Sequence, residues 1–261
     1  MIKIGIIGGS GFEKLHIIDD IQKIKKDTPY GAPSDLIITG SYKGVEVVII
    51  PRHGEAHQII PSHVNSRANI WAMKDLGVSH ILATTAVGSL EETIKPGHLV
   101  FPDQFIDRTT KRKATFFEGP EVCHISMADP FCPQLRKKLS EASKKLDCEY
   151  HETGTVVTIE GPRFSTRAES KMFRQWGADI INMSTVPEVI LAREAGICYA
   201  TIAMSTDYDC WRESETVVTW EMIAKVMKRN VKNVTSLLFE IIPQVDFTEC
   251  ACREAIKTAM V

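Results

Sequence analysis

No part of this 261-residue sequence is apolar for the roughly 20 consecutive residues that a membrane-spanning helix needs. The first residues also lack the basic segment and the cleavage site of a signal peptide. Net charge is low, because 31 Lys and Arg residues are balanced by 33 Asp and Glu residues. No excess of charge therefore favours nucleic acid or a membrane surface. These absences predict a cytoplasmic protein whose partners are small molecules.

Internal repeats, low-complexity tracts and an interdomain linker are absent as well. We therefore expect a single domain over residues 1–261, a length that one large α/β domain can fill. Residues 245–261 are expected to form a C-terminal tail that carries a Cys-x-Cys motif.

The seven cysteines are not arranged in the paired C-x-x-C units of a zinc site. Five are expected to be buried thiols of an intracellular protein: Cys123, Cys132, Cys148, Cys198 and Cys210. The tail segment "ECACRE" differs, because Cys250 and Cys252 lie one residue apart and have the pattern of exposed residues. That pair predicts either a reactive dithiol or a strained disulfide.

Two nucleotide-binding motifs are also missing. The glycine turn "GGSG" follows an apolar run, but Lys14 occupies the place of the third glycine in G-x-G-x-x-G when the motif is read from Gly9. The sequence G-x-x-x-x-G-K-[ST] does not occur either. The turn is therefore either a binding loop for a small anion, formed by backbone N–H groups, or a simple tight turn.

Short β-rich runs alternate with helical patterns, which indicates an α/β protein. The predicted strands are residues 1–7, 35–40, 45–50, 79–85, 154–159, 178–183 and 197–205. The predicted helices are residues 64–76, 133–146, 166–177, 185–196 and 220–241. Polar segments follow several of the predicted strands, and open α/β sheets bind ligands at the carboxyl ends of strands.

A basic segment, "PRHGEAHQIIPS", follows the predicted strand 45–50. Arg52 has a planar fork of donors that fits phosphate bidentately, and His53 and His57 lie beside it. At a strand end this composition favours phosphate binding over a solvated loop.

Three other strand ends carry candidate ligand groups. The segment "ATTAVGSL" at 83–90 either lets a ligand approach the backbone or forms a tight strand end. Phe164 either stacks on a planar ring or packs in the core, and taken alone the core is favoured. Asp207 and Asp209 follow the last long strand and either serve a ligand, as a proton donor, or form a turn or helix cap.

Together these segments resemble the trimeric nucleoside phosphorylase superfamily, and within it the members that cleave 5′-methylthioadenosine. The matching runs occur in order from Gly5 to about Trp211 and include "GIIGGSG", "PRHGEAH", "TTAVGSL", "TIEGPRFSTRAES", "INMSTVPEV" and "TDYDCW". The resemblance implies a single-domain, three-layer α/β/α fold with a central mixed, partly barrel-like sheet flanked by helices.

The resemblance also implies a set of site residues. Phosphate would be bound by Ser10, Arg52, His53, Thr85, the amide of Ala86, and Ser184. The purine would be bound by Ala86, Val87, Gly88, Phe164, Ser165, Ile181 and Asn182, and the ribose by Met183. Asp207 would protonate purine N7, and Asp209 would lie near the 6-amino group. The 5′-methylthio group would be surrounded by His57, His124 from a neighbouring subunit, and the 218–223 stretch with Val218 and Trp220.

The implied reaction is phosphorolysis of 5′-methylthioadenosine to adenine and 5-methylthioribose 1-phosphate. Inorganic phosphate would be a co-substrate, and no metal or organic cofactor would be needed. The implied assembly is a trimer or a dimer of trimers with sites at subunit interfaces. For a thermophilic source, the resemblance also implies a disulfide between Cys250 and Cys252, with further bridges from Cys132, Cys198 or Cys148.

Three alternatives are open at this point. A related phosphorylase of broader specificity, acting on adenosine, inosine or guanosine, would differ only in the 5′ pocket and at Asp207. A non-catalytic purine- or phosphate-binding protein would be expected to lack Arg52 or Asp207, and both are present. A nicotinamide-dependent dehydrogenase would need the complete glycine fingerprint, which is missing.

Overall fold

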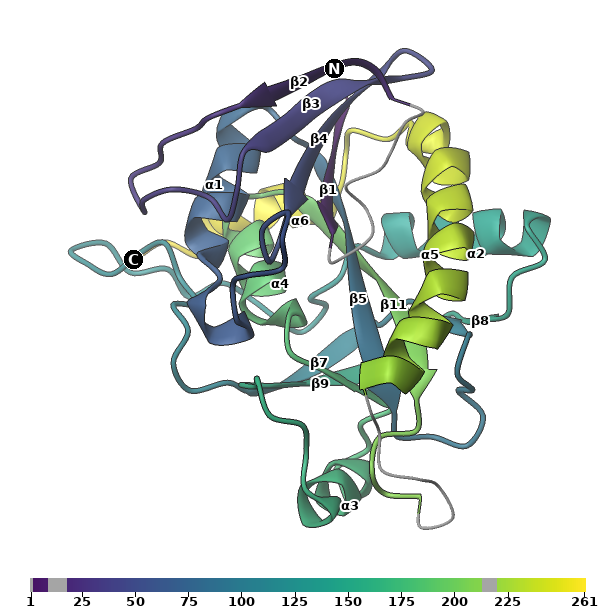
Figure 1. Ribbon diagram of the computed structural model, residues 1–261. Coiled ribbons are helices and arrows are strands. Elements are labelled where there is room, and N and C mark those ends of the chain that lie inside the picture. Colours follow the sequence, from purple (N-terminus) through teal and green to yellow (C-terminus); the bar gives the residue numbers. More distant parts are fainter. Residues whose placement is uncertain (1, 9–17, 213–219) are drawn as a thin grey trace.

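Figure 1 shows the computed structural model, which describes residues 2–8, 18–212 and 220–261. In this part of the chain, eleven strands form one mixed sheet. The first five are β1 (Lys3–Gly8), β2 (Asp19–Ile24), β3 (Ile37–Tyr42), β4 (Val45–Pro51) and β5 (His80–Ser89). The others are β6 (Leu99–Val100), β7 (Gln104–Arg108), β8 (Tyr150–His151), β9 (Thr155–Ile159), β10 (Ile180–Asn182) and β11 (Cys198–Asp207).

Strand β5 is the branch point of the sheet. Its first half pairs in parallel with β1, and its last two residues, Gly88 and Ser89, pair antiparallel with β10. It also pairs in parallel with β11 along most of its length. The main path therefore runs β2-β3-β4-β1-β5-β10-β9-β7, while β11, β6 and β8 leave it at β5. This branching gives the partly closed, mixed sheet that the family resemblance implied.

Helices cover both faces of the sheet. They are α1 (Ser66–Asp75), α2 (Pro133–Lys145), α3 (Arg167–Gln175), α4 (Thr185–Glu194), α5 (Trp220–Ile241) and the short α6 (Ala251–Glu254). Figure 1 shows α2 and α5 on one side of the central strands and α1 and α4 on the other. The predicted three-layer α/β architecture is thus confirmed, and each predicted helix is present within a few residues of its expected bounds.

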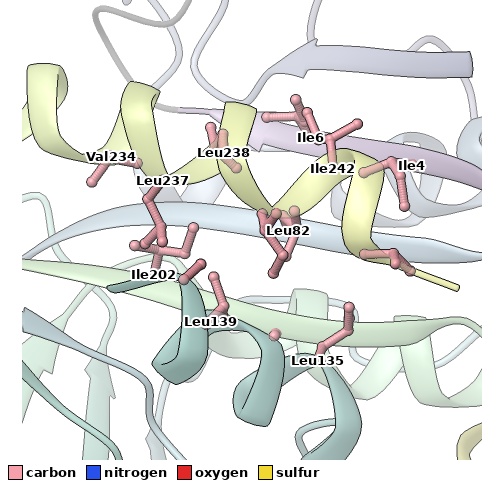
Figure 2. Close-up of a cluster of buried hydrophobic side chains, with 14 of the residues drawn as sticks. Ile4, Ile6, Leu82, Leu135, Leu139, Ile202, Val234, Leu237, Leu238 and Ile242 are labelled. Atoms are coloured by element: carbon pink, nitrogen blue, oxygen red, sulfur yellow. The ribbon is translucent and has the colours of Figure 1, made fainter. Parts of the chain in front are cut away.

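The sheet has a hydrophobic core on each face, because side chains along a strand alternate between the two faces. Ile4 and Ile6 of β1 pack with Leu82 against α2 and α5, as Figure 2 shows. Ile7 lies in a second cluster, which contains apolar residues of α1 and α4. Successive residues of a strand point to opposite faces, so a central strand buried on both sides must be apolar almost throughout.

Local sequence signals place several element ends correctly. Lys43 and Gly44, both with positive φ, form the two-residue turn between β3 and β4. Thr166 and Glu169 form both hydrogen bonds of a capping box at the start of α3. Gly77, with φ of 79°, follows α1 in the left-handed conformation that glycine adopts without steric cost.

One strand is longer than the sequence predicted, and four strands were not predicted. The strand predicted to end at residue 85 continues to Ser89, because β10 and β11 supply hydrogen-bond partners to its second half. Strands β2, β6, β7 and β8 were not predicted. Strand β2 is a largely exposed edge strand rich in charged residues, which carry little strand signal. Strands β6 and β8 have only two residues each.

The burial of the cysteines also differs from expectation. Cys250 and Cys252 were expected to be exposed, but they are 9% and 2% exposed. The reason is that the α6 segment, Cys250 to Glu254, packs against the apolar cluster that joins β1 and β5 to α2 and α5, which we call the α2/α5 core cluster. Of the five cysteines expected to be buried, two are buried and three are only partly buried. The buried two are Cys132 and Cys198, and the other three are Cys123, Cys148 and Cys210.

None of the helices in the described residues is long and apolar enough to cross a membrane.

Candidate active site

A cavity of about 610 Å³ lies at the ends of β4, β10 and β11, beside the second half of β5. It brings together most of the residues singled out in the sequence. These are Arg52, His53, His57, Thr85, Ala86, Val87, Gly88, Phe164, Ser165, Ile181, Asn182, Met183, Ser184, Asp207 and Asp209. They come from segments more than 150 residues apart, and the strand order places them around one volume.

Arg52 follows β4 directly and is buried, with 2% of its surface exposed. Its Nε donates to Oε1 of Glu188 at 2.5 Å, and its Nη2 donates to Oε2 at 2.9 Å. Its Nη1 donates to the Thr84 carbonyl oxygen at 2.8 Å. The bidentate face expected to meet phosphate is therefore occupied by Glu188. Of the five N–H groups of a guanidinium, these contacts use three, which leaves one hydrogen on each Nη for a ligand.

Glu188 makes this burial tolerable. Burial alone would lower the pKa of Arg52, but the Glu188 carboxylate opposes this and leaves the pKa raised. Glu188 is itself fully buried on α4, and the Tyr199 hydroxyl donates to its Oε2 at 3.0 Å. Both carboxylate oxygens thus have donors, which is what a buried charge requires.

His53 is held as a neutral imidazole. Its Nδ1 lies 2.8 Å from the carbonyl oxygen of Ile59, which can only accept, so Nδ1 carries the hydrogen. Burial and the neighbouring Arg52 charge lower the pKa of His53 to about 4. In the neutral ring, Nε2 is therefore the acceptor, and His53 can receive a hydrogen bond from a ligand O–H group.

A hydroxyl and amide network forms one wall of the cavity. The Asn182 side chain accepts from the Thr158 hydroxyl at 2.9 Å and donates to the hydroxyls of Thr185 and Thr85 at 2.7 and 3.3 Å. The Thr85 hydroxyl also lies 2.8 Å from that of Ser184. Asn182 lines the cavity, and its amide also holds Thr85 in place beside Ser184; its expected purine contact stays a prediction.

The two carboxylates lie together at the end of β11. Asp207 accepts at Oδ2 from the Thr206 hydroxyl at 2.7 Å and at Oδ1 from the Asp209 backbone N–H at 2.8 Å. Burial raises the pKa of Asp209, against the opposing effect of a hydrogen bond with Ser170. A Cβ on Gly88 would lie 3.2 Å from Asp207 Oδ1 and 3.3 Å from the Asp209 Cβ, so glycine allows this close approach.

The remaining wall is apolar. Phe164 lines the cavity with 52% of its surface exposed, so the expectation from the residue alone, that it packs in the core, was wrong. Met227 and Val231 of α5, together with Ile60 and Pro61, complete this apolar part. The predicted 218–223 stretch lies almost entirely outside the described side chains, so its contribution to the cavity stays a prediction.

Four predicted residues are not placed in the cavity. Ser10 and Val218 lie outside the described residues, and the Trp220 side chain does too, although its backbone begins α5. His124 does not line the cavity within this chain; its backbone N–H donates to the Ala259 carbonyl oxygen at 2.8 Å. Its expected role required a neighbouring subunit, and it remains a prediction.

Two residues that organise the site were not predicted. Glu188 is the ion-pair partner of Arg52, and its only signal in the sequence is a carboxylate in the mainly apolar run "VPEVILA". Arg112 donates to the carbonyl oxygens of Met183 and Val186 at 2.7 and 2.6 Å. It fixes the loop after β10, and its position in a polar loop gave no signal.

The family model of the phosphorylase superfamily matches residues 3–243, and the chain therefore belongs to that superfamily. Within it, this chain is 55% identical over 249 residues to S-methyl-5′-thioadenosine phosphorylase of Danio rerio, covering 94% of this chain and 89% of that protein. It is 52% identical over 262 residues to the protein of the same name from Pyrococcus horikoshii, covering all of both.

The fold of this chain is also similar to that of a solved member of the superfamily. It is methylthioadenosine phosphorylase from Schistosoma mansoni in complex with adenine. It superposes with a TM-score of 0.94 at 40% identity and covers 99% of this chain and 99% of its own. The superfamily and fold that the sequence motifs implied are confirmed.

The buried Arg52–Glu188 pair yields a stability prediction. Glu188→Gln keeps the shape but leaves the Arg52 charge buried without its counter-ion, so we expect the free energy of unfolding to fall by about 3–5 kcal/mol. Glu46→Gln is the matched control: Glu46 pairs with Lys3 but its side chain is 51% exposed, so a loss of about 0–1 kcal/mol is expected. Urea unfolding measures both. Equal stabilities of the two variants would contradict the assignment.

Proposed function

We propose that this protein catalyses phosphorolysis of S-methyl-5′-thioadenosine, a pentosyl transfer to inorganic phosphate that gives adenine and 5-methylthioribose 1-phosphate. The observation that carries the proposal is one cavity whose lining combines Arg52 and neighbouring hydroxyl groups, a carboxylate pair, and apolar side chains. The relatives from Danio rerio and Pyrococcus horikoshii are both named S-methyl-5′-thioadenosine phosphorylase. This favours S-methyl-5′-thioadenosine as the substrate over adenosine, inosine or guanosine.

Phosphate is assigned to the side of the cavity formed by Arg52, His53, Thr85 and Ser184. The two remaining Nη hydrogens of Arg52 and the two hydroxyls donate to phosphate oxygens. Neutral His53 accepts from the one protonated oxygen of HPO₄²⁻ through Nε2. Because Glu188 neutralises much of the Arg52 charge, phosphate keeps negative charge to direct at the reacting sugar.

Positive charge develops on the ribose as the glycosidic bond breaks, since the transition state is oxocarbenium-like. The bound phosphate is both the nucleophile and the anion facing that charge. Holding phosphate and nucleoside in one cavity also removes much of the entropic barrier, worth up to about 7–11 kcal/mol in ideal cases.

The purine leaves with a negative charge unless it is protonated. We assign the general acid to Asp207, with proton delivery to N7, and place Asp209 near the 6-amino group. Both aspartates are 9% exposed and adjoin Gly88, beside which a planar ring can approach the backbone. Phe164 is assigned to stack on the purine, and Met227 and Val231 to contact the methylthio group.

Metal and organic cofactors have no role in this scheme. Phosphate supplies the nucleophile, an aspartic acid supplies the proton, and the hydrogen bonds around Arg52 supply electrostatic stabilisation. Inorganic phosphate is a co-substrate.

The substrate assignment is tested by adenine or hypoxanthine release from methylthioadenosine, adenosine and inosine, each with and without inorganic phosphate. We expect release to require phosphate and to be fastest from methylthioadenosine. A preference for inosine would overturn the base and 5′ assignments while leaving the phosphate site. Binding without release of any base would make the protein a non-catalytic nucleoside-binding member of the superfamily.

The general acid is tested by Asp207→Asn. We expect kcat to fall at least about a hundredfold while the KM for phosphate changes little, because only leaving-group protonation is removed. Asp129→Asn, on an exposed aspartate outside the cavity lining, is the matched control and should keep full activity. Asp209→Asn in the same series decides between the two carboxyl groups. A larger loss there than in Asp207→Asn would assign the proton to Asp209.

We also propose a trimer, or a dimer of trimers, in which His124 completes the 5′ end of a neighbouring subunit's cavity. The support is the superfamily resemblance together with the position of His124 outside the cavity of its own chain. Sedimentation should give a mass near three or six times 29.1 kDa. His124→Ala should raise the KM for methylthioadenosine more than that for adenosine. A monomer with full activity would contradict the proposal.

A further inference from the structure

Four cysteines from three separate segments meet in the core on the α2/α5 side of the sheet. Cys132 precedes α2, Cys198 begins β11, and Cys250 and Cys252 belong to the α6 segment. Their four sulfur atoms all lie within 4.8 Å of one another. Cys132, Cys198 and Cys252 are at most 2% exposed, and Cys250 is 9% exposed.

The spacing of the sulfurs matches one mononuclear tetrahedral centre. With zinc–sulfur bonds of about 2.3 Å, the sulfurs of a tetrahedral site lie about 3.8 Å apart. The Cys132 and Cys250 sulfurs are 3.7 Å apart, whereas a disulfide bond measures about 2.05 Å. Iron–sulfur clusters divide their thiolates between two or more irons and so need a wider set of sulfurs.

The surroundings supply what a buried tetrathiolate site requires. Zinc with four thiolates carries two negative charges, and Nη1 of Arg193 lies 3.6 Å from the Cys252 sulfur as a charged donor. The backbone is fixed as well, because the Cys132 N–H donates to the Tyr199 carbonyl oxygen at 2.8 Å. Apolar residues of the α2/α5 core cluster enclose the sulfurs and exclude competing oxygen ligands.

We propose that Cys132, Cys198, Cys250 and Cys252 bind one structural Zn²⁺ ion as a tetrahedral tetrathiolate. Four S–H bonds are replaced by four Zn–S bonds, up to four protons pass to solvent, and nothing is oxidised or reduced. The ion ties the C-terminal segment to the starts of α2 and β11. Cys198 and Asp207 are the first and last residues of β11, so the metal lies at the far end of that strand from the catalytic cavity.

The sequence lacks paired C-x-x-C units, but cysteines distant in the sequence can also form a zinc site. Cys250-x-Cys252 is one half of a site here, and the other half is formed by Cys132 and Cys198, which are distant in the sequence and are brought together by the fold. The disulfides suggested for these cysteines compete for the same sulfurs; all seven cysteines are free thiols in the structure. Zinc binding and disulfide formation are therefore mutually exclusive outcomes.

The test uses the full chain, produced in zinc-containing medium and purified under reducing conditions without chelator. Metal analysis by mass spectrometry should give about one zinc per chain. Cys252→Ser should lower zinc content at least tenfold. The matched control is Cys148→Ser, which removes a partly buried cysteine outside the cluster and should keep zinc.

A second measurement is independent of whether Cys252→Ser folds. Wild-type protein reconstituted with Co²⁺ should show the thiolate-to-metal charge-transfer band and intense ligand-field bands of a tetrahedral cobalt thiolate. Two results would overturn the proposal. In a parallel preparation purified without reductant, metal-free protein with three free thiols in denaturant would show two disulfides. Seven free thiols, with neither zinc nor a cobalt spectrum after metal addition, would show a plain thiol cluster.

Discussion

The ion pair between Arg52 and Glu188 is the contact around which the candidate site is organised. It joins the end of β4 to α4, and through Thr84 and Tyr199 it also reaches β5 and β11. Removing two charges from water costs several kcal/mol per ion, and the pair is stabilised because both carboxylate oxygens have donors and three guanidinium N–H groups have acceptors. The guanidinium is thereby fixed before any ligand arrives, and a fixed donor loses little entropy on binding phosphate.

Preorganisation extends from this pair into the rest of the cavity. Asn182 holds Thr85, Arg112 holds the loop that carries Met183, and the Ile59 carbonyl oxygen fixes the tautomer of His53. These supporting contacts set the geometry of the groups that line the cavity, which is how a site directs dipoles at developing charge without reorganising during a reaction.

Much of this could be predicted from the sequence, for identifiable reasons. Strand and helix runs were long and periodic, and their ends carried strong signals such as the Thr166–Glu169 capping box. Residues such as Arg52 and Asp207 directly follow or end apolar strands, so strand topology alone brings them to one cavity. The far half of β5 and strand β7 were missed because they pair with strands distant in the sequence. Strand β2 was missed because its charged residues carry little strand signal, and β6 and β8 because each has only two residues.

The supporting groups and the thiol cluster were beyond sequence reasoning for a related reason. Arg52 and Glu188 are 136 residues apart in the sequence. A charged residue in an apolar helix shows that it needs a counter-ion, but not which residue supplies it. Cys250 and Cys252 looked exposed because the tail is short and polar, yet α6 packs against the core. Such contacts depend on which segments the sheet and helices bring together, and that is a property of the whole fold.

The unbroken course of β5 has one more consequence. The strand supplies Thr85 on the side of the cavity proposed for phosphate and Gly88 beside the carboxylates, three residues further on. At about 3.3 Å per residue, this fixes a separation of about 10 Å that no side-chain rotation can alter. The backbone of β5 thus sets a fixed distance between the Thr85 end and the Gly88 end of the cavity. Inserting or deleting a single residue between these positions would change the length by one step and turn the following side chains to the opposite face.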